Sequence, residues 1–361
     1  MKPRRAYILW LALCLLALLS LYQYVYLQNI NLPKWRGSNS HHRGRLRNVS
    51  ILLWHWPFRR AYPLQGDVCL NMYSIPHCFI TDDRSLFDQA DVVVFHHHEL
   101  QISSQKLPLH LPRPPSQKWV WLSLEPPAVN RDLTKINHLF NLTMSYRRDA
   151  DIPMPYGRMV PRPQRIDPHG EKKPLHSFVV PWENHTCLAS WVVSNFKRHH
   201  RRSHVYLELR KHIPINVYGA ANKKRLATDQ LLPTVGRCHF YLAFENSVSR
   251  DYITEKLWRN SFQAANVPVV LGPPRSNYEA FVPRDSFIHV DDFGSAKELG
   301  SFLKRLAANR THYESYFRWR EKYDVHVPSD WRERLCHICK RYNELPPFKV
   351  YHDLHGWAKK E

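Results

Sequence analysis

Short apolar runs separated by polar segments recur along the first half of the chain, and they predict parallel β-strands. The runs are rich in β-branched and aromatic residues, which is typical of strands covered on both faces. They lie at 49–54, 78–80, 91–95, 119–124 and 139–145. We expect one α/β domain over 48–160.

A proline-rich, basic interval at 161–174 follows and predicts a linker. A second alternating set then begins, which predicts another α/β domain over 175–345 and a C-terminal tail over 346–361. Its expected strands are 188–194, 215–218, 240–244, 267–272 and 287–290, and its expected helices are 202–212, 295–308, 313–323 and 331–342. Two such sets indicate two Rossmann-like domains facing a cleft.

The N-terminus has the pattern of a membrane anchor. Residues 6–27 contain no charged side chain, and about 20 residues suffice to cross the hydrocarbon layer. Basic residues precede this segment, so we expect a cytoplasmic tail at 1–5, an anchor at 6–28 and a stem at 29–47. A cleaved signal peptide is the alternative, but tyrosines at 22, 24 and 26 continue the segment as an interfacial belt.

The body has features of a lumenal protein. Its N-x-S/T sequons are at Asn48, Asn141, Asn184 and Asn309. Six of the seven cysteines lie beyond the expected anchor, so we expect disulfides. Cys336 and Cys339 form C-x-x-C, but without a second such pair a zinc site has little support.

The charge of +21 narrows the choice of partners. An anchored lumenal protein without a nucleic-acid motif is not expected to bind nucleic acid. Acidic partners remain, such as a nucleotide diphosphate, sialylated glycans or anionic lipids.

The stretch 240–274 carries the densest group of candidate site residues. An apolar strand at 240–244 ends in Glu245 and Asn246, where ligands bind in open α/β sheets. A helix capped by Asp251 or Thr254 then places Tyr252, Glu255 and Lys256 at the same edge. The ordinary alternative for Glu255 and Lys256 is capping and solvated charge.

Long motifs in the same region resemble the eukaryotic α-1,3-fucosyltransferases of glycosyltransferase family 10. The resemblance is carried by FENS at 244–247, DYITEKLWRN at 251–260 and VPVVLGPP at 267–274, and it extends to ILLWHWPF at 51–58, KWVWLSLE at 118–125, SYRRDADIPMPYGR at 145–158 and DWRERLCHICKRY at 330–342. It implies a GT-B type Golgi membrane enzyme that uses GDP-fucose as donor substrate, with no tightly bound cofactor and no obligatory metal. The implied acceptors are lactosamine glycans on glycoproteins and glycolipids, and the tail motifs favour sialylated ones over neutral ones.

The resemblance also assigns roles to residues. It places Arg202 and Lys256 at the donor diphosphate and Glu125 as the catalytic base. Around guanosine and fucose it places Ser194, Asn195, Tyr241, Glu245, Asn246, Tyr252 and Glu255. It favours a Cys187–Cys238 disulfide, with Cys69 and Cys78 either joined to each other or each crossed to Cys336 or Cys339.

The chemistry of the transfer agrees with these roles. Negative charge grows on the departing diphosphate, and fixed cations or a metal must stabilise it. Asp149 and Asp151 form a D-x-D that could hold manganese, but neighbouring arginines could satisfy both carboxylates. The acceptor hydroxyl needs a base, and Glu125 follows an expected strand, although an exposed strand-end glutamate is an equal reading of its position. One base without a nucleophile predicts inversion, giving an α-fucoside from a β-linked donor.

Two departures from the family pattern raise a second hypothesis. Residues 126–129 read Pro-Pro-Ala-Val where relatives usually have Ser-Pro-Ser/Thr-His, and His98 replaces an arginine. A membrane-anchored glycan-binding protein without turnover is therefore the alternative. A metal cluster of His96 to Glu99 is not expected, because alternate strand residues point to opposite faces.

Overall fold

The computed structural model describes residues 48–102, 106–162 and 180–360, all within the compact unit Arg47–Glu361. The expected cytoplasmic tail, anchor and stem lie outside these residues, as does most of the expected linker. Within the described ranges, no helix combines the length and the apolar character needed to cross a membrane.

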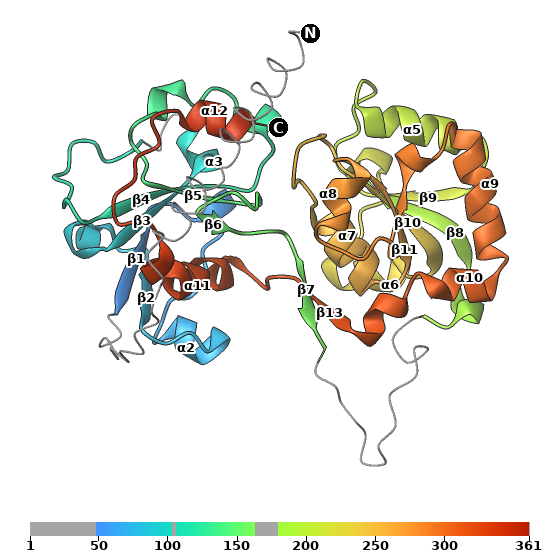
Figure 1. The fold of residues 1–361 in the computed structure, drawn as a ribbon, viewed down its shortest axis with the longest axis horizontal. Coiled ribbons are helices and arrows are strands. Elements are labelled where there is room, and N and C mark those ends of the chain that lie inside the picture. The colour runs from blue at the N-terminus through green and yellow to red at the C-terminus, as the bar shows by residue number, and fades with distance from the viewer. Residues whose placement is uncertain (1–47, 103–105, 163–179, 361) are drawn as a thin grey trace, which may run out of the picture. The chain divides into compact units, whose positions relative to one another are not determined.

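The first sheet has six parallel strands in the order β2-β1-β3-β4-β5-β6 (Figure 1). The strands are β1 (Val49–Leu53), β2 (Cys78–Thr81), β3 (Val92–His96), β4 (Lys118–Ser123), β5 (Leu142–Ser145) and β6 (Ile152–Pro153). The helices between them are short and include α2 (Val68–Tyr73), α3 (His97–Leu100) and α4 (Pro127–Asn130). Four of the five expected strand positions match within two residues, and β5 begins three residues later than expected.

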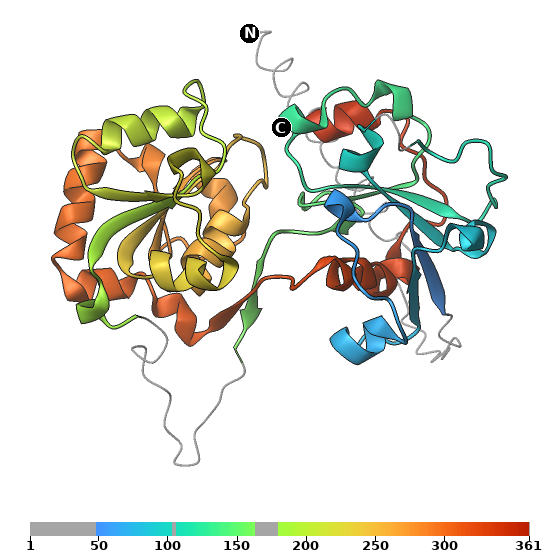
Figure 2. The same ribbon diagram turned by 180° about the vertical axis from the view of Figure 1, so that it is seen from behind.

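The second sheet has five parallel strands in the order β12-β11-β10-β8-β9. Figure 2 shows this sheet from behind, in yellow-green to orange. They are β8 (Cys187–Val192), β9 (Ile215–Tyr218), β10 (Cys238–Phe244), β11 (Val267–Leu271) and β12 (Ile288–His289). The accompanying helices are α5 (Arg201–Leu209), α6 (Thr228–Val235), α7 (Glu255–Leu257), α8 (Arg275–Glu279), α9 (Ala296–Ala307) and α10 (Arg310–Ser315). The helix after β10 is irregular, because α7 continues as the π-helical turn η7 (Trp258–Gln263).

Both sheets share one topology. Numbered along the chain within each sheet, the first five strands are ordered 2-1-3-4-5, so the strand order reverses between β1 and β3 and again between β8 and β10. Ligands of doubly wound folds bind beyond the carboxyl ends of the strands at this reversal. The topology therefore marks one candidate edge on each sheet.

Alternating side chains build two apolar layers on each sheet. In β4, Trp119 and Trp121 pack into the cluster on one face, whereas Val120 and Leu122 pack into the cluster on the other. This is the period-2 alternation of a strand buried on both faces. The second sheet is covered in the same way, with Phe240 and Leu242 on one face and Tyr241 and Ala243 on the other.

The C-terminal helices belong to the core of the first sheet. The chain leaves that sheet through β7 (Arg158–Pro161) and returns through the antiparallel β13 (Tyr323–His326). In α11 (Trp331–Arg341), Leu335 and Ile338 are fully buried in the cluster that contains Val49 and Val92. The sequence assigned residues up to 345 to the second domain, whereas the fold adds α11 and then α12 (Leu354–Lys359) to the first.

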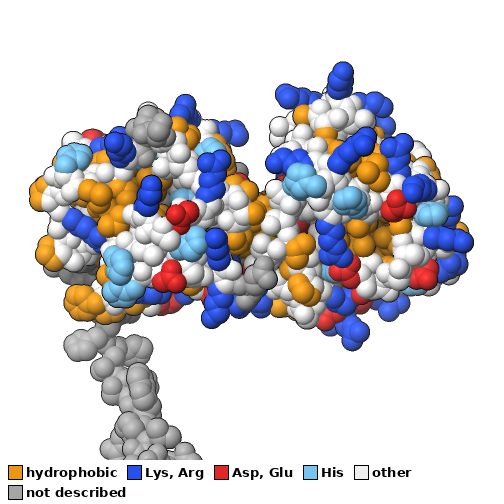
Figure 3. Space-filling model, turned by 90° about the horizontal axis from the view of Figure 1, so that it is seen from above, with side chains coloured by type: hydrophobic (Ala, Val, Ile, Leu, Met, Phe, Trp, Pro, Cys, Tyr) orange, Lys and Arg blue, Asp and Glu red, His pale blue; other side chains and the backbone are white. Residues whose placement is uncertain are grey.

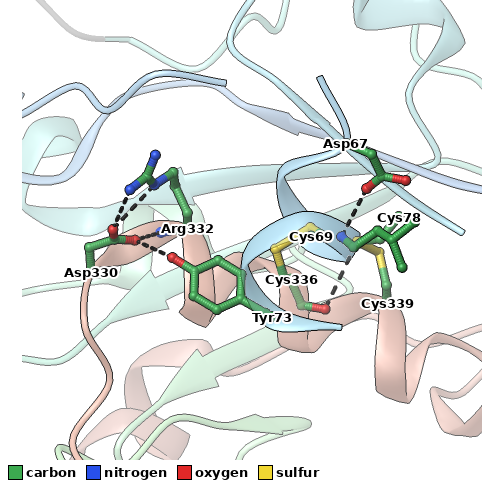
Figure 4. Close-up of a disulfide and its surroundings, with 9 residues drawn as sticks. Asp67, Cys69, Tyr73, Cys78, Asp330, Arg332, Cys336 and Cys339 are labelled. Atoms are coloured by element: carbon green, nitrogen blue, oxygen red, sulfur yellow. Dashed lines mark hydrogen bonds and ion pairs between the residues drawn. A yellow bond between two sulfur atoms is a disulfide. The ribbon is translucent and has the colours of Figure 1, made fainter. Parts of the chain in front are cut away.

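Two disulfides join α11 to α2 and to β2 (Figure 4). They join Cys69 to Cys336 and Cys78 to Cys339, so the crossed alternative of the sequence analysis is the one observed. Asp67 caps α2 by accepting the backbone N–H of Leu70 at 2.9 Å. The third disulfide, Cys187–Cys238, joins β8 to β10 and confirms the favoured pair.

Candidate active site

Glu245 is the centre of the polar edge at the end of β10. Its side chain is buried, and Oε1 accepts hydrogen bonds from the backbone N–H of Thr254 at 2.8 Å and from its hydroxyl at 2.9 Å. Oε2 accepts one from the Lys256 ammonium at 2.9 Å. Gly272 makes room for this carboxylate, since a Cβ there would lie 3.1 Å from Glu245 Cγ and 2.6 Å from the Tyr278 hydroxyl.

Lys256 is held in place by three neighbouring groups. Besides Glu245, its Nζ donates to Thr254 Oγ1 at 2.7 Å and to Glu255 Oε1 at 3.1 Å, and its side chain is 12% exposed. Burial disfavours the charged amine, but the carboxylates of Glu245 and Glu255 outweigh it and raise the pKa of Lys256. The ammonium is therefore a fixed positive charge at the start of α7.

The expected helix caps have other partners. Thr254 occupies the N-cap position of α7, but its hydroxyl binds Glu245 and makes no capping hydrogen bond. Asp251 is buried three residues earlier and accepts hydrogen bonds from Arg148 and Asn277. The cap expected at Asp251 is therefore not formed.

The two glutamates that flank Lys256 differ in exposure. The Glu255 side chain is 45% exposed, whereas that of Glu245 is 1% exposed. Burial raises the pKa of Glu245, and Lys256 offsets only part of this effect. For Glu255 burial acts in the same direction, but Lys256 outweighs it and lowers the pKa. Glu255 is thus an ionised acceptor that a ligand can reach.

Arg202 lies at the neighbouring strand end, in the first turn of α5. Its side chain is buried, and Nη2 donates to the backbone carbonyl of Asn195 at 2.5 Å. Nε is buried and has no hydrogen-bond partner among the described residues. Burial lowers the pKa of Arg202, and Glu245 and Glu255 oppose this shift, so the three charges lie within electrostatic range of one another.

The remaining expected donor-site residues fall into two groups. Ser194 and Asn195 are exposed just beyond β8, and the side-chain oxygen of Asn246 is buried without a hydrogen-bond partner in the described part of the chain. Tyr241, by contrast, is fully buried, and its hydroxyl accepts a hydrogen bond from Asn260 at 3.0 Å. Tyr252 is also buried, with its ring centroid 5.1 Å from that of Tyr146.

Glu125 follows β4 by two residues, and its main chain is held by nearby polar groups. Its backbone N–H donates to Ser123 Oγ at 3.2 Å, and its carbonyl accepts from the Asn130 amide at 3.0 Å. None of the hydrogen bonds among the described residues involves its carboxylate. The local fold therefore fixes the backbone and leaves the acid group available.

Burial and nearby charges shift the pKa of Glu125. Burial raises this pKa, while His96, His98 and Lys256 lower it and Glu255 raises it further. The charges of Glu255 and Lys256 therefore lie within electrostatic range of the Glu125 carboxyl group. Glu125 and the charged pair Glu255 and Lys256 are thus electrostatically coupled, whereas direct contacts between these groups are observed, in the described part of the chain, only among Glu245, Glu255 and Lys256.

The two alternative metal sites have other structural roles. Arg147 donates to both oxygens of Asp149, at 2.8 and 2.7 Å, and Asp151 accepts from Lys349 at 2.6 Å and Tyr351 at 2.8 Å. Within the described ranges, no group of three or more His, Cys, Asp or Glu side chains is arranged to hold a metal ion.

The histidine run adopts a different backbone from the one expected. Strand β3 ends at His96, and the residues that follow form α3. The side chains of His96 to Glu99 therefore point apart because the backbone turns into a helix, and not because strand residues alternate between faces. His96 pairs with the buried Glu99, while His97 contacts the carbonyl of Asn130 at 3.0 Å. Burial lowers the pKa of His97 to about 4.

Sequence reasoning missed three residues that shape this site. Tyr156 donates its hydroxyl to the carbonyl of Leu124 at 2.7 Å, and Tyr146 packs on Tyr252. Asn130 bridges the Glu125 carbonyl and Ser123 Oγ, the latter at 2.7 Å. The position of the two tyrosines in the sequence could have marked them as site residues, because each closely follows a strand of the first sheet.

Comparison with known proteins decides the family. The fucosyltransferase N-terminal family model matches residues 46–157, and the C-terminal model of glycosyltransferase family 10 (fucosyltransferase) matches residues 182–357. The chain belongs to glycosyltransferase family 10, the fucosyltransferases.

Similar proteins within family 10 share one linkage in their names. The chain is 48% identical to α-(1,3)-fucosyltransferase 7 of Homo sapiens over 310 residues, which is 86% of each chain. It is 41% identical to 4-galactosyl-N-acetylglucosaminide 3-α-L-fucosyltransferase 9 of Bos taurus, over 87% of this chain and 83% of that one. The family 10 chain described here is thus an α-(1,3)-fucosyltransferase, a glycosyltransferase.

A solved structure supports the GT-B-like fold of this family 10 member. An α1,3-fucosyltransferase crystallised with GDP-fucose matches it with a TM-score of 0.53 at 17% identity, covering 85% of this chain and 93% of the other. At that identity the match concerns the fold alone.

Proposed function

We propose that this enzyme transfers fucose from GDP-β-L-fucose to O3 of N-acetylglucosamine in sialylated N-acetyllactosamine, with inversion at the anomeric carbon, to give a sialyl-Lewis x type product. The observation that carries this proposal is the electrostatic proximity of the Glu125 carboxyl group to Glu255 and Lys256. The proposed base for the acceptor is therefore electrostatically coupled to fixed charges suited to a nucleotide sugar.

Glu125 acts as the general base. It accepts the proton of the acceptor hydroxyl as that oxygen attacks the anomeric carbon and the bond to the β-phosphate breaks. Its raised pKa makes it a better proton acceptor than an exposed glutamate once it is ionised. With no second carboxylate acting as nucleophile, the displacement is direct.

Arg202 and Lys256 stabilise the leaving diphosphate in place of a divalent cation. Each is a buried or nearly buried cation at the strand reversal of the second sheet. Fixed charges in a site with little water require no reorganisation as negative charge develops. Glu255 is exposed enough to accept hydrogen bonds from ribose or fucose hydroxyls, and the buried oxygen of Asn246, which has no partner among the described residues, is a second acceptor.

The proposed acceptor and location follow from charge, the N-terminus and the relatives. Lysine and arginine side chains are spread over the face seen in Figure 3, in keeping with a net charge of +21 that favours acidic glycans. The uncharged segment at 6–27 is the proposed signal anchor of a single-pass type II Golgi protein with a lumenal catalytic domain. Four relatives at 46–48% identity are named α-(1,3)-fucosyltransferase 7.

Product formation by the purified lumenal portion tests the proposal. It is incubated with labelled GDP-fucose and with sialylated or neutral N-acetyllactosamine, with and without a chelator of divalent cations. We expect α-1,3-fucosylated product that is greatest with the sialylated acceptor and largely retained with chelator. Absence of product from every acceptor would contradict the transfer, and complete loss on chelation that only manganese restores would contradict the role given to the two cations.

A further inference from the structure

A hollow of about 460 Å³ lies beside the candidate active site and has no role in the chemistry described above. It is lined by Arg148 from the segment after β5, by the loop after β10 and by the start of α8; the lining residues of the last two are Val248, Ser249, Arg250, Pro274, Ser276 and Asn277. Its lining is therefore cationic and rich in hydroxyl and amide groups, with an apolar wall at Val248 and Pro274.

Contacts run from the hollow to Tyr146, which is electrostatically coupled to the proposed base. Arg148 pairs with the fully buried carboxylate of Asp251, and Tyr252 follows Asp251 directly. The ring of Tyr252 packs on Tyr146, and the pKa of the Tyr146 phenol, raised by burial, is further raised by both Asp251 and Glu125. Tyr146 thus lies within electrostatic range of Asp251, which pairs with Arg148 of the lining, and of Glu125.

The charges around the hollow do not balance. Three guanidinium groups, those of Arg147, Arg148 and Arg250, share the two carboxylates of Asp149 and Asp251. One positive charge therefore has no matching carboxylate within this group of five side chains. A ligand with a single carboxylate would complete the pairing.

Arg250 is the cation with the weakest contacts. Its guanidinium lies 3.9 Å from Asp149 and 3.9 Å from Asp251, beyond hydrogen-bond distance of both. Its side chain is 41% exposed, and no hydrogen bond from it to another described residue is formed. Arg148 donates two hydrogen bonds to the Asp251 carboxylate, from its backbone N–H at 3.0 Å and from its Nε at 3.1 Å. Arg250 is thus the group free to bind a carboxylate bidentately.

We propose that this hollow is the acceptor subsite for an acidic sugar, a sialic acid, whose carboxylate Arg250 binds. The apolar wall matches the N-acetyl methyl group, and the hydroxyls of Ser249 and Ser276 match the polyol side chain of such a sugar. The inference rests on the proposed function and assigns its acceptor preference to one residue outside the reaction chemistry.

The test compares acceptor selectivity in variants of the lumenal protein. The measured quantity is the ratio of kcat/KM for sialylated N-acetyllactosamine to that for neutral N-acetyllactosamine. We expect Arg250→Gln to lower this ratio about ten-fold, mainly through the KM of the sialylated acceptor, because a charge-assisted hydrogen bond is lost. Arg305→Gln is the matched control, since it removes an exposed arginine of α9 outside the hollow, and it leaves the ratio unchanged.

A second variant keeps Arg250 in place. Ser276→Asp adds a carboxylate at an exposed position of the lining and should lower the same ratio by repulsion, with a smaller effect at high salt. A ratio within two-fold of wild type in both variants overturns the subsite, as does a wild-type enzyme with no preference for the sialylated acceptor. Failure of the wild type to fucosylate any acceptor would instead refute the proposed function.

Discussion

The two sheets have the same strand order, yet the edges at the carboxyl ends of their strands carry different kinds of charged side chains. At the edge of the second sheet, Lys256 is paired with Glu245 and Glu255, and Arg202 is buried beside them. At the first, Glu125 has a desolvated carboxyl group with no hydrogen-bond partner among the described residues. One strand order thus holds paired charges at one edge and, at the other, an acid without a hydrogen-bond partner in the described part of the chain. This is the division expected if the paired charges bind the anionic donor and the acid accepts the proton, as proposed above.

Removing the unpaired acid should have the largest effect. Glu125→Gln keeps the size and the backbone contacts of the side chain but cannot accept the proton, so we expect kcat to fall about a thousand-fold with little change in the KM for GDP-fucose. Steady-state kinetics measure this effect. Glu321→Gln, at an exposed position outside both edges, is the control and should be neutral. Near-normal turnover of a folded Glu125→Gln protein would rule out the base.

Breaking the pre-paired charges should cost stability as well as donor binding. Lys256→Met leaves Glu245 buried without its cation, so we expect a loss of about 3 kcal/mol in the free energy of unfolding, measured by denaturant titration. The raised pKa of Glu245 should rise further in this variant, and the deficit should shrink as pH falls because a protonated Glu245 needs no cation.

A double variant separates the two roles of Lys256. Lys256→Met with Glu245→Gln removes both charges, so it should recover most of the stability while GDP-fucose affinity stays low. Calorimetric titration with GDP-fucose measures that affinity. If the double variant also regains wild-type affinity, the lysine serves the fold and not the donor.

The smallest expected effect concerns pH. Because burial raises the pKa of Glu125, the acid limb of the kcat/KM profile should lie above the range of an ordinary glutamate, with activity lost as pH falls through it. His98 lowers that pKa when it is charged, and an arginine is charged at every pH of the assay. His98→Arg should therefore move the limb to lower pH, and His98→Ala should not. An unmoved limb in His98→Arg would show that His98 does not act on the base.

The strands were predictable because each buried run has a local signal. The runs at β1, β3, β4, β10 and β11 are apolar, β-branched and aromatic, and all five are strands. The antiparallel pair β7 and β13 was missed, since residues 158–161 find their partner only at 323–326, far along the chain. Helix α6 was missed because Pro233, which ordinarily ends a helix, lies inside it.

The site was predictable only as far as strand ends and motifs could define it. Glu245, Glu255 and Lys256 were expected at one edge, and the structure brings them into contact. Two other contacts depend on packing between segments distant in sequence. The Tyr241 hydroxyl accepts a hydrogen bond from Asn260, and Asp251 binds Arg148 instead of capping a helix. Local pattern carries no information on such contacts.

The disulfides that join α2 and β2 to α11 set the order in which the chain can mature. Cys69 and Cys78 are synthesised early, but their disulfide partners Cys336 and Cys339 follow 267 and 261 residues later in the chain. The second Rossmann unit, which is synthesised in between, holds its own disulfide over only 51 residues. The earlier-made half of the enzyme therefore cannot form its two native disulfides until the last part of the chain has been made.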